Sequence, residues 1–278
     1  MAKKYVDLHI HTTASDGTLI PEELIVEIKD SDIELFSVTD HDSMSNVLEM
    51  KAIAKREGIS FIPGIELSAT FMGREFHLLT YGINPEDPQL IKRVVKNQDI
   101  RETHNRAVIE YVSQKYKAVS LEGYENYERD PSRGGWKAEN YLFDMGVTSS
   151  LSDFFMVISD MGRQLIFDPL EVVLPELVNM GYTVVLAHPP AYFKGECLSE
   201  EILKAFKNWG LSGIECYSPY YKDASQYAYY KEYCQKNDLL VTSGSDYHGK
   251  FISSRKLARP KVTSQEVSFE ALLKLSKD

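Results

Sequence analysis

Short apolar runs alternate with longer segments of helical periodicity along most of the chain. The apolar runs contain four to seven residues, a length typical of buried strands. The expected strands are Tyr5–Ile10, Leu35–Thr39, Ile59–Pro63, Glu75–Tyr81, Thr183–Ala187, Gly213–Tyr217 and Leu239–Thr242. The expected helices between them are Pro21–Asp30, Met44–Glu57, Leu170–Asn179, Ser199–Trp209 and Ala224–Lys236. This alternation predicts an α/β fold with mostly parallel strands.

The middle of the chain departs from this pattern. Segment Ile100–Gln114 has the periodicity of a helix, residues 122–137 are polar and contain glycines, and residues 138–146 indicate a short helix that ends at Gly146. We therefore expect residues 96–167 to form a small helical insertion that acts as a lid and sets specificity. Residues 1–95 and 168–278 are expected to form the α/β body.

Composition and charge narrow the class of protein. A chain of 278 residues with 43% hydrophobic residues is long enough for a large core. The formal net charge of −10 argues against long nucleic acids as partners, because these need a basic face. No apolar run is long enough to cross a membrane, and Asp7 and His9 interrupt any signal-like start. Three cysteines in no metal-binding spacing indicate free thiols and a cytoplasmic protein.

Six of the seven histidines lie in short motifs that also carry acidic residues or follow an apolar run. The candidate metal ligands in these motifs are His9, His11, Asp16, His41, Glu66, His77, His188, Asp246 and His248. Imidazole nitrogens mixed with carboxylate oxygens suit divalent Zn, Mn or Fe. Such ions convert water into a nucleophile near neutral pH, so we expect a multinuclear hydrolytic site.

The motif DLHIH places His9 and His11 two residues apart at the end of an expected strand. Because strand side chains alternate between faces, both imidazoles should point to the same side. Asp16 can reach back from the following loop, where Gly17 supplies a turn. The alternative is a pair of surface histidines on an edge strand.

His41 lies in TDHD, where an apolar strand should end, and active sites of α/β folds form at that edge. The neighbouring Asp40 or Asp42 could orient the imidazole or cap the next helix. Glu66 has apolar neighbours, and a carboxylate there is costly unless it is paired or bound to metal. The alternative for Glu66 is a solvent-facing position on an alternating strand.

The remaining histidines carry weaker signals. His77 alone would more often be a core histidine with satisfied hydrogen bonds, whereas His188 follows an apolar run. Asp246 and His248 follow another such run and lie two residues apart. His104 lies in a helical segment without an acidic loop, so we expect it at the surface.

The motifs DLHIHTTASDG, SVTDHD, IPGIELS, HLLTYG, VLAHP and VTSGSDYHG occur in this order. In order and spacing they resemble the PHP (polymerase and histidinol phosphatase) family of metal-dependent phosphoesterases. The resemblance implies a distorted (β/α)7 TIM-like barrel with metals at the carboxyl ends of the strands and an inserted helical domain. It also implies phosphoester hydrolysis by a hydroxide that bridges two ions.

The resemblance further assigns the candidate ligands residue by residue. It implies two or three divalent ions and three ligand sets, of which the first and the third share Glu66: His9, His11, Glu66 and Asp246; Asp16, His41 and His248; Glu66, His77 and His188. Glu66 and Asp246 are also the expected catalytic residues, because they would bridge the ions or orient the hydroxide.

The chain departs from the family where relatives bind the substrate. Trp136 and Lys137 stand where many relatives carry an Arg-Pro-His motif, and Tyr220 and Tyr221 lie where relatives often have a histidine nearby. The candidate substrate-binding residues are Arg101, Asn105 and Lys137. A solvated helix surface is the alternative for all three.

Because these departures concern substrate-binding positions, the sequence defines the reaction better than it defines the substrate. We expect a small phosphorylated substrate, with a nucleoside 3′,5′-bisphosphate as the first candidate. Alternatives are an exonuclease on short 5′-phosphorylated oligonucleotides, a phosphatase for histidinol phosphate or another sugar or amino-alcohol phosphate, and a non-catalytic metal- or nucleotide-binding module. Amide hydrolysis or deamination is a further alternative, because amidohydrolases also begin with an HxH strand, although SDYH favours the PHP set.

Overall fold

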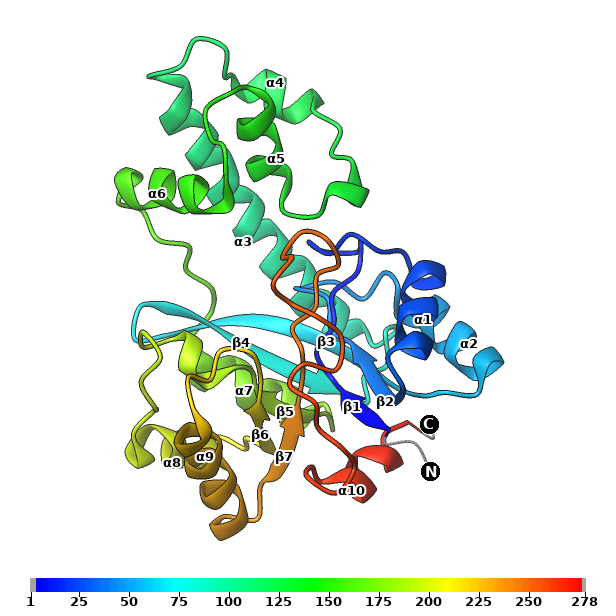
Figure 1. Ribbon diagram of the computed structural model, residues 1–278. Helices are drawn as coiled ribbons and strands as arrows, with labels where there is room; N and C mark the ends of the chain where they lie inside the picture. The colour runs from blue at the N-terminus through cyan, green and yellow to red at the C-terminus, as the bar shows by residue number, and fades with distance from the viewer. Residues whose placement is uncertain (1–3, 277–278) are drawn as a thin grey trace.

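In the computed structural model, which describes residues 4–276, seven strands lie in one sheet in sequence order (Figure 1). They are β1 (Tyr5–Asp7), β2 (Ile33–Val38), β3 (Ser60–Phe71), β4 (Arg74–Tyr81), β5 (Thr183–Leu186), β6 (Gly213–Tyr217) and β7 (Leu240–Ser243). Neighbouring strands are parallel except at β4, which is antiparallel to both β3 and β5. The expected α/β fold is confirmed, and the antiparallel β4 was not anticipated.

The sheet closes on itself into a barrel. Beyond β1, the amide of Leu8 donates to the carbonyl of Ser243 at 2.9 Å, and the amide of His11 donates to the carbonyl of Tyr247 at 2.8 Å. A compact set of buried side chains fills the interior: Val6, Leu8, Leu35, Ile62, Leu79, Tyr81, Val185, Ala187 and Leu272. Closure with a filled interior makes this a small, distorted TIM-like barrel, as expected.

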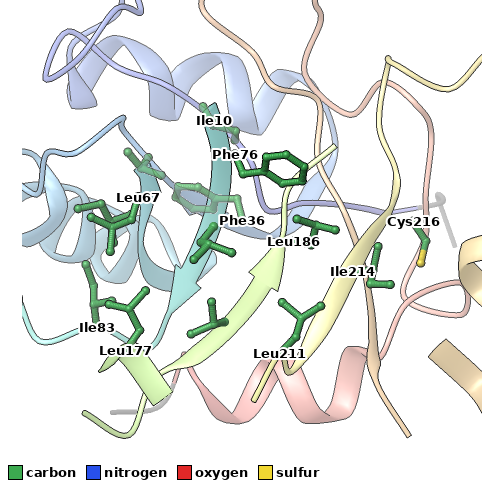
Figure 2. Close-up of a cluster of buried hydrophobic side chains, with 14 of the residues drawn as sticks. Ile10, Phe36, Leu67, Phe76, Ile83, Leu177, Leu186, Leu211, Ile214 and Cys216 are labelled. Atoms are coloured by element: carbon green, nitrogen blue, oxygen red, sulfur yellow. The ribbon is translucent and has the colours of Figure 1, made fainter. Parts of the chain in front are cut away.

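Helices cover the outside of the barrel. They are α1 (Pro21–Asp30), α2 (Val47–Glu57), α7 (Leu170–Asn179), α8 (Glu200–Asn208) and α9 (Ala224–Lys236), and α10 (Phe269–Lys274) lies at the end where strands begin (Figure 1). Figure 2 shows strand residues such as Phe36, Leu67 and Leu186 in one buried cluster that also contains Leu177 of α7. Each strand thus buries one face in the barrel interior and the other face against the helices. This explains why the strand sequences are nearly continuous apolar runs.

The connection from β4 to β5 contains a separate group of helices: α3 (Pro88–Ser113), α4 (Leu121–Asn126), α5 (Lys137–Asp144) and α6 (Leu151–Met161). Figure 1 shows α3 rising from the barrel to the other three. These helices bury their own apolar cluster: Val108, Ile109, Val112, Val119, Tyr124, Ala138, Tyr141, Leu142 and Phe154. The expected helix start at Ile100 was wrong, because Asp87 caps the helix and Pro88 occupies its first turn.

A second boundary also differs from expectation. Strand β3 continues to Phe71, well past the expected end at Pro63, because residues 64–71 pair with β4 as a hairpin. Glu66 therefore projects from a long strand and not from a loop. No helix in residues 4–276 is long and apolar enough to cross a membrane.

Candidate metal centre

The nine expected ligands converge at one end of the barrel. Seven of them are buried, and His41 and His77 are partly buried. Donor atoms of seven of them form three groups in which all atoms lie within 4.8 Å of one another: His11, Asp16, His41 and His248; His9, His11 and Glu66; His41, Glu66 and His77. Side chains from loops after β1, β2, β5 and β7 thus meet side chains that project from β3 and β4.

Glu66 lies at the middle of the centre and is fully buried. Five imidazole nitrogens lie 3.0–3.3 Å from its two carboxylate oxygens, and they belong to His9, His11, His41, His77 and His188. Although burial raises it, the surrounding imidazoles bring the pKa of Glu66 well below its usual value. The carboxylate is therefore ionised. Its Oε2 atom lies next to His9, His11 and His41, and its Oε1 atom lies next to His77 and His188.

Asp16 and Asp246 supply negative charge on the other sides. An oxygen of Asp16 lies 3.3 Å from His248 Nε2, and Asp246 Oδ1 lies 3.1 Å from His11 Nε2. The other oxygen of Asp246 accepts a hydrogen bond of 3.0 Å from the Tyr220 hydroxyl. Carboxylate and imidazole donors therefore alternate around the centre, the mixed set that Zn, Mn and Fe accept.

Several buried donor atoms in this cluster have no hydrogen-bond partner. Glu66 Oε2 and His41 Nδ1 are only 3.0 Å apart, yet neither makes a hydrogen bond, and His188 Nδ1 is also unpaired. Unpaired buried polar atoms are costly unless something satisfies them. A divalent cation would satisfy the lone pairs of Glu66 and His41, so the residues present fit a bound metal.

The pKa values of the imidazoles are also consistent with a metal centre. Burial and the charges of His248 and His41 lower the pKa of His11 to about 3. Although burial opposes it, Glu66 and Glu75 raise the pKa of His77 to about 10, and Asp16 and Asp246 raise that of His248 to about 9. Without cations, protons on His77 and His248 therefore offset the carboxylate charge, and a cation has to displace them.

The backbone is strained at the centre. His188, Asp246 and Asp42 all have positive φ angles, of 25°, 51° and 45° respectively. Residues other than glycine rarely adopt positive φ angles, and such conformations persist where surrounding contacts hold them. Here the strain turns the loops after β2, β5 and β7 so that their polar side chains face the centre.

Glu215 was missed in the sequence, although it is fully buried in β6. Its two oxygens accept hydrogen bonds from His9 Nδ1 at 3.0 Å and from the His188 amide at 2.7 Å. The contact places the proton of His9 on Nδ1 and leaves Nε2 free to face the centre. An acid inside the apolar segment GIECY was the available signal, the same one that identified Glu66.

A second layer of acids holds the loops. Asp40 accepts hydrogen bonds from the amide and hydroxyl of Thr12, and Asp42 accepts from the amide and hydroxyl of Ser68. The helix α2 is preceded by Asn46, so neither aspartate caps it. The side-chain hydrogen bonds of both aspartates go to residues other than His41, so the structure supports neither of the two roles considered, and the aspartates hold neighbouring loops instead.

The three candidate substrate-binding residues lie in different places. Arg101 lines a cavity of about 250 Å³ that opens over the centre. Asn105 hydrogen-bonds to the hydroxyl of Tyr124 within the helical part. The ammonium group of Lys137 donates to the carbonyl of Glu125 at 3.2 Å and lies over the Tyr124 ring. The structure therefore brings only Arg101 to the cavity above the centre.

His104 is not at the surface, contrary to expectation. It is 4% exposed and lines a separate hollow of about 640 Å³ between α3 and residues 163–166. The segment that follows α6 returns along α3 and covers this imidazole, a tertiary contact that helical periodicity could not reveal.

Comparisons with known proteins agree with the geometry. The PHP domain family matches residues 7–141. A 3′,5′-nucleoside bisphosphate phosphatase from Chromobacterium violaceum is 27% identical, over 87% of each chain. A 5′-3′ exoribonuclease from Haemophilus influenzae is 26% identical, over 89% of this chain and 91% of its own.

A solved structure has the same fold throughout. It is a protein from Bifidobacterium adolescentis described as a metal-dependent phosphoesterase, with a TM-score of 0.84 and 23% identity over 99% of this chain and 97% of its own. That overlap covers the helical part as well as the barrel. Family match, relatives and fold agree: residues 7–141 match the PHP domain family, and the chain is a metal-dependent phosphoesterase.

Proposed function

We propose that this protein removes a phosphoryl group from a small, nucleotide-sized phosphomonoester, using two or three divalent ions. The observation that carries the proposal is the set of three donor groups, two of which share Glu66, beneath an open cavity. Mn, Zn and Fe all suit these donors. Ions bound there would activate a water molecule and offset charge on the phosphoryl oxygens.

We assign the ions to three ligand sets, as the family resemblance implies: His9, His11, Glu66 and Asp246; Asp16, His41 and His248; Glu66, His77 and His188. The distances given above support this assignment, and they add that His11 and His41 each lie near two of the sets. Glu66 and Asp246 are the proposed catalytic residues, because both carboxylates lie within 3.1–3.4 Å of the Nε2 atoms of His9 and His11, where they could bridge ions or orient a hydroxide.

Hydrolysis needs a nucleophile, and the cavity suggests water. Among the described residues that line the cavity there is no serine, threonine or cysteine. The oxygen of water would bond to phosphorus while the ester P–O bond breaks, and the alcohol would leave with a proton. The helical part covers one side of the cavity through Trp136, Leu151 and Phe155, which supports its role as a lid.

A nucleoside 3′,5′-bisphosphate is the first substrate candidate, because a phosphatase of that name aligns over 87% of the chain. Short 5′-phosphorylated RNA is the second, because exoribonucleases align over a similar share. All three cysteines are free thiols, and Cys216 and Cys234 remain unbonded with their sulfurs 3.7 Å apart. This supports a reducing compartment such as the cytoplasm.

Phosphate release by Mn-loaded protein tests the proposal. The substrates are a nucleoside 3′,5′-bisphosphate, a 5′-phosphorylated tetranucleotide, a sugar phosphate and an amide, each assayed with and without a chelator. We expect chelator-sensitive phosphate release and no amide hydrolysis. Release that survives complete removal of metal, or amide hydrolysis alone, would refute the proposal.

A further inference from the structure

The cavity over the metal centre has an apolar rim of five residues: Trp136, Leu151, Phe155, Phe251 and Ile252. Three of them come from the helical part, and two from the loop after β7. We propose that this apolar rim binds the planar ring of the substrate's leaving group, so that recognition depends on the ring and not on a second phosphate. The inference rests on the proposed function and names its substrate class.

Phe155 gives the first reason. It lies on α6 and is 59% exposed, although it lines the cavity mouth. A large exposed aromatic side chain contributes little to the fold, and it gains most by covering a ligand. Its position above buried ionic groups fits a ligand with a charged end and an apolar end.

Phe251 gives the second reason, because it is held in place. A Cβ atom at Gly134 would lie 2.6 Å from the Cβ of Phe251, and one at Gly135 would lie 2.9 Å from its ring. Both glycines have positive φ angles, near 70°, so the loop can pass close to the ring. The phenylalanine is thereby fixed between the two parts of the chain, with its ring on the cavity wall.

The cations near the rim contact protein groups, which disfavours a separate receptor for a second phosphate. Among the described residues that line the cavity, Arg101 is the only cationic side chain besides the histidines. Its Nη2 donates to Glu75 Oε1 at 2.8 Å and to Ser68 Oγ at 2.9 Å. Its guanidinium group also lies between the rings of Trp136 and Phe167, at 4.5 and 5.1 Å. The Nη2 atom of Arg101 is therefore already engaged, whereas its Nε has no hydrogen-bond partner among the described residues.

The other cations near the rim are engaged as well. Arg129 donates to the backbone carbonyls of Thr13, Ser15 and Gly135. Arg255 lies over the Tyr220 ring at 4.1 Å, and its Nη1 forms an ion pair of 3.5 Å with Asp246 without a hydrogen bond. The phosphoryl group to be cleaved is thus recognised below, at the metal centre, and the rim offers mainly aromatic and aliphatic surface. Base–aromatic stacking tolerates any base, which predicts little preference among nucleobases.

The test separates ring from phosphate with three ligands: adenosine 3′,5′-bisphosphate, adenosine 5′-monophosphate and ribose 5-phosphate. Binding to Mn-loaded protein is measured by calorimetry, whether or not the ligand is hydrolysed. We expect loss of the base to weaken binding about tenfold or more, because one stacked base contributes about 1–3 kcal/mol. Loss of the second phosphate should change binding less than about threefold. The reverse order of effects would overturn the inference.

Two matched variants locate the ring. Phe155→Ala should weaken adenosine monophosphate binding about tenfold and leave ribose 5-phosphate binding unchanged, while Phe155→Tyr restores it. Phe143→Ala is the control, because Phe143 is 49% exposed on α5 and does not line the cavity. Equal effects of Phe155→Ala and Phe143→Ala would refute the rim's role. Absence of any hydrolysis with intact ring-dependent binding would refute the proposed function alone.

Discussion

Replacing Glu215 by glutamine should weaken metal binding, although Glu215 is not itself an expected ligand. Its two oxygens accept from His9 Nδ1 and from the His188 amide in a fully buried position. Glutamine has one acceptor oxygen, so it can keep only one of these contacts and turns an N–H group toward the other donor. His9 and His188 then lose the support that orients them.

The size of the effect follows from the lost contact. A buried hydrogen bond to a charged group contributes about 1.5–3 kcal/mol, and residues that support metal ligands typically change affinity or activity 10- to 100-fold. We therefore expect Glu215→Gln to reduce Mn affinity and phosphate release by roughly 10- to 100-fold. Calorimetric metal titration measures the first quantity, and initial rates at saturating Mn measure the second.

The control is Glu232→Gln, which changes an exposed glutamate on α9. Thermal unfolding of the metal-free variants shows whether Glu215→Gln still folds. Wild-type metal affinity in a folded Glu215→Gln protein would contradict the reasoning, because the hydrogen bonds to His9 and His188 would then have no influence on the centre.

Three further predictions concern protons and packing. Cations must displace protons from His77 and His248, whose pKa values are about 10 and 9, so apparent Mn affinity should rise with pH up to about 10 and binding should release protons. Calorimetry in two buffers measures both effects, and pH-independent affinity would contradict this prediction. Burial raises the pKa of Glu139 from 4.5 to about 7, so its contribution to stability is complete below pH 4.5 and is lost as pH rises through 7. Glu139→Gln should then raise the free energy of unfolding at pH 8 by up to about 3 kcal/mol, and not at pH 4.5, in metal-free urea titrations; an equal gain at both values would refute it. Leu142→Ala truncates a fully buried side chain of the helical part, so it should lower the free energy of unfolding by about 2–5 kcal/mol in the same urea titrations. Mn affinity should stay unchanged. Loss of Mn binding in the folded variant would contradict a core of the helical part that is separate from the metal centre.

The sequence predicts the barrel well where one local rule decides the structure. Pro21–Asp30 and Gly213–Tyr217 have the expected bounds, because caps and apolar runs define them. His9 and His11 face the same side, with ring centroids 5.1 Å apart, because strand side chains alternate. Nine motif residues also meet in space, since each follows or lies within a strand of one barrel.

Tertiary packing decides the rest. The antiparallel hairpin of β3 and β4 depends on pairing between strands, so the extension of β3 to Phe71 could not be predicted from local pattern alone. Lys137 and Asn105 turn toward Tyr124 because the helices of the insertion pack around that ring. The apolar rim joins residues more than 100 positions apart, and no local pattern links Trp136 to Phe251.

The central claim is that Glu66 joins three sets of donors around several cations. Diffraction from crystals soaked in Mn, recorded near the manganese absorption edge, tests it directly. We expect two or three anomalous peaks among His9, His41, His77 and the other donors, with at least two of them next to the Glu66 carboxylate. Ordered imidazoles without anomalous peaks between them, or peaks remote from Glu66, would contradict the account.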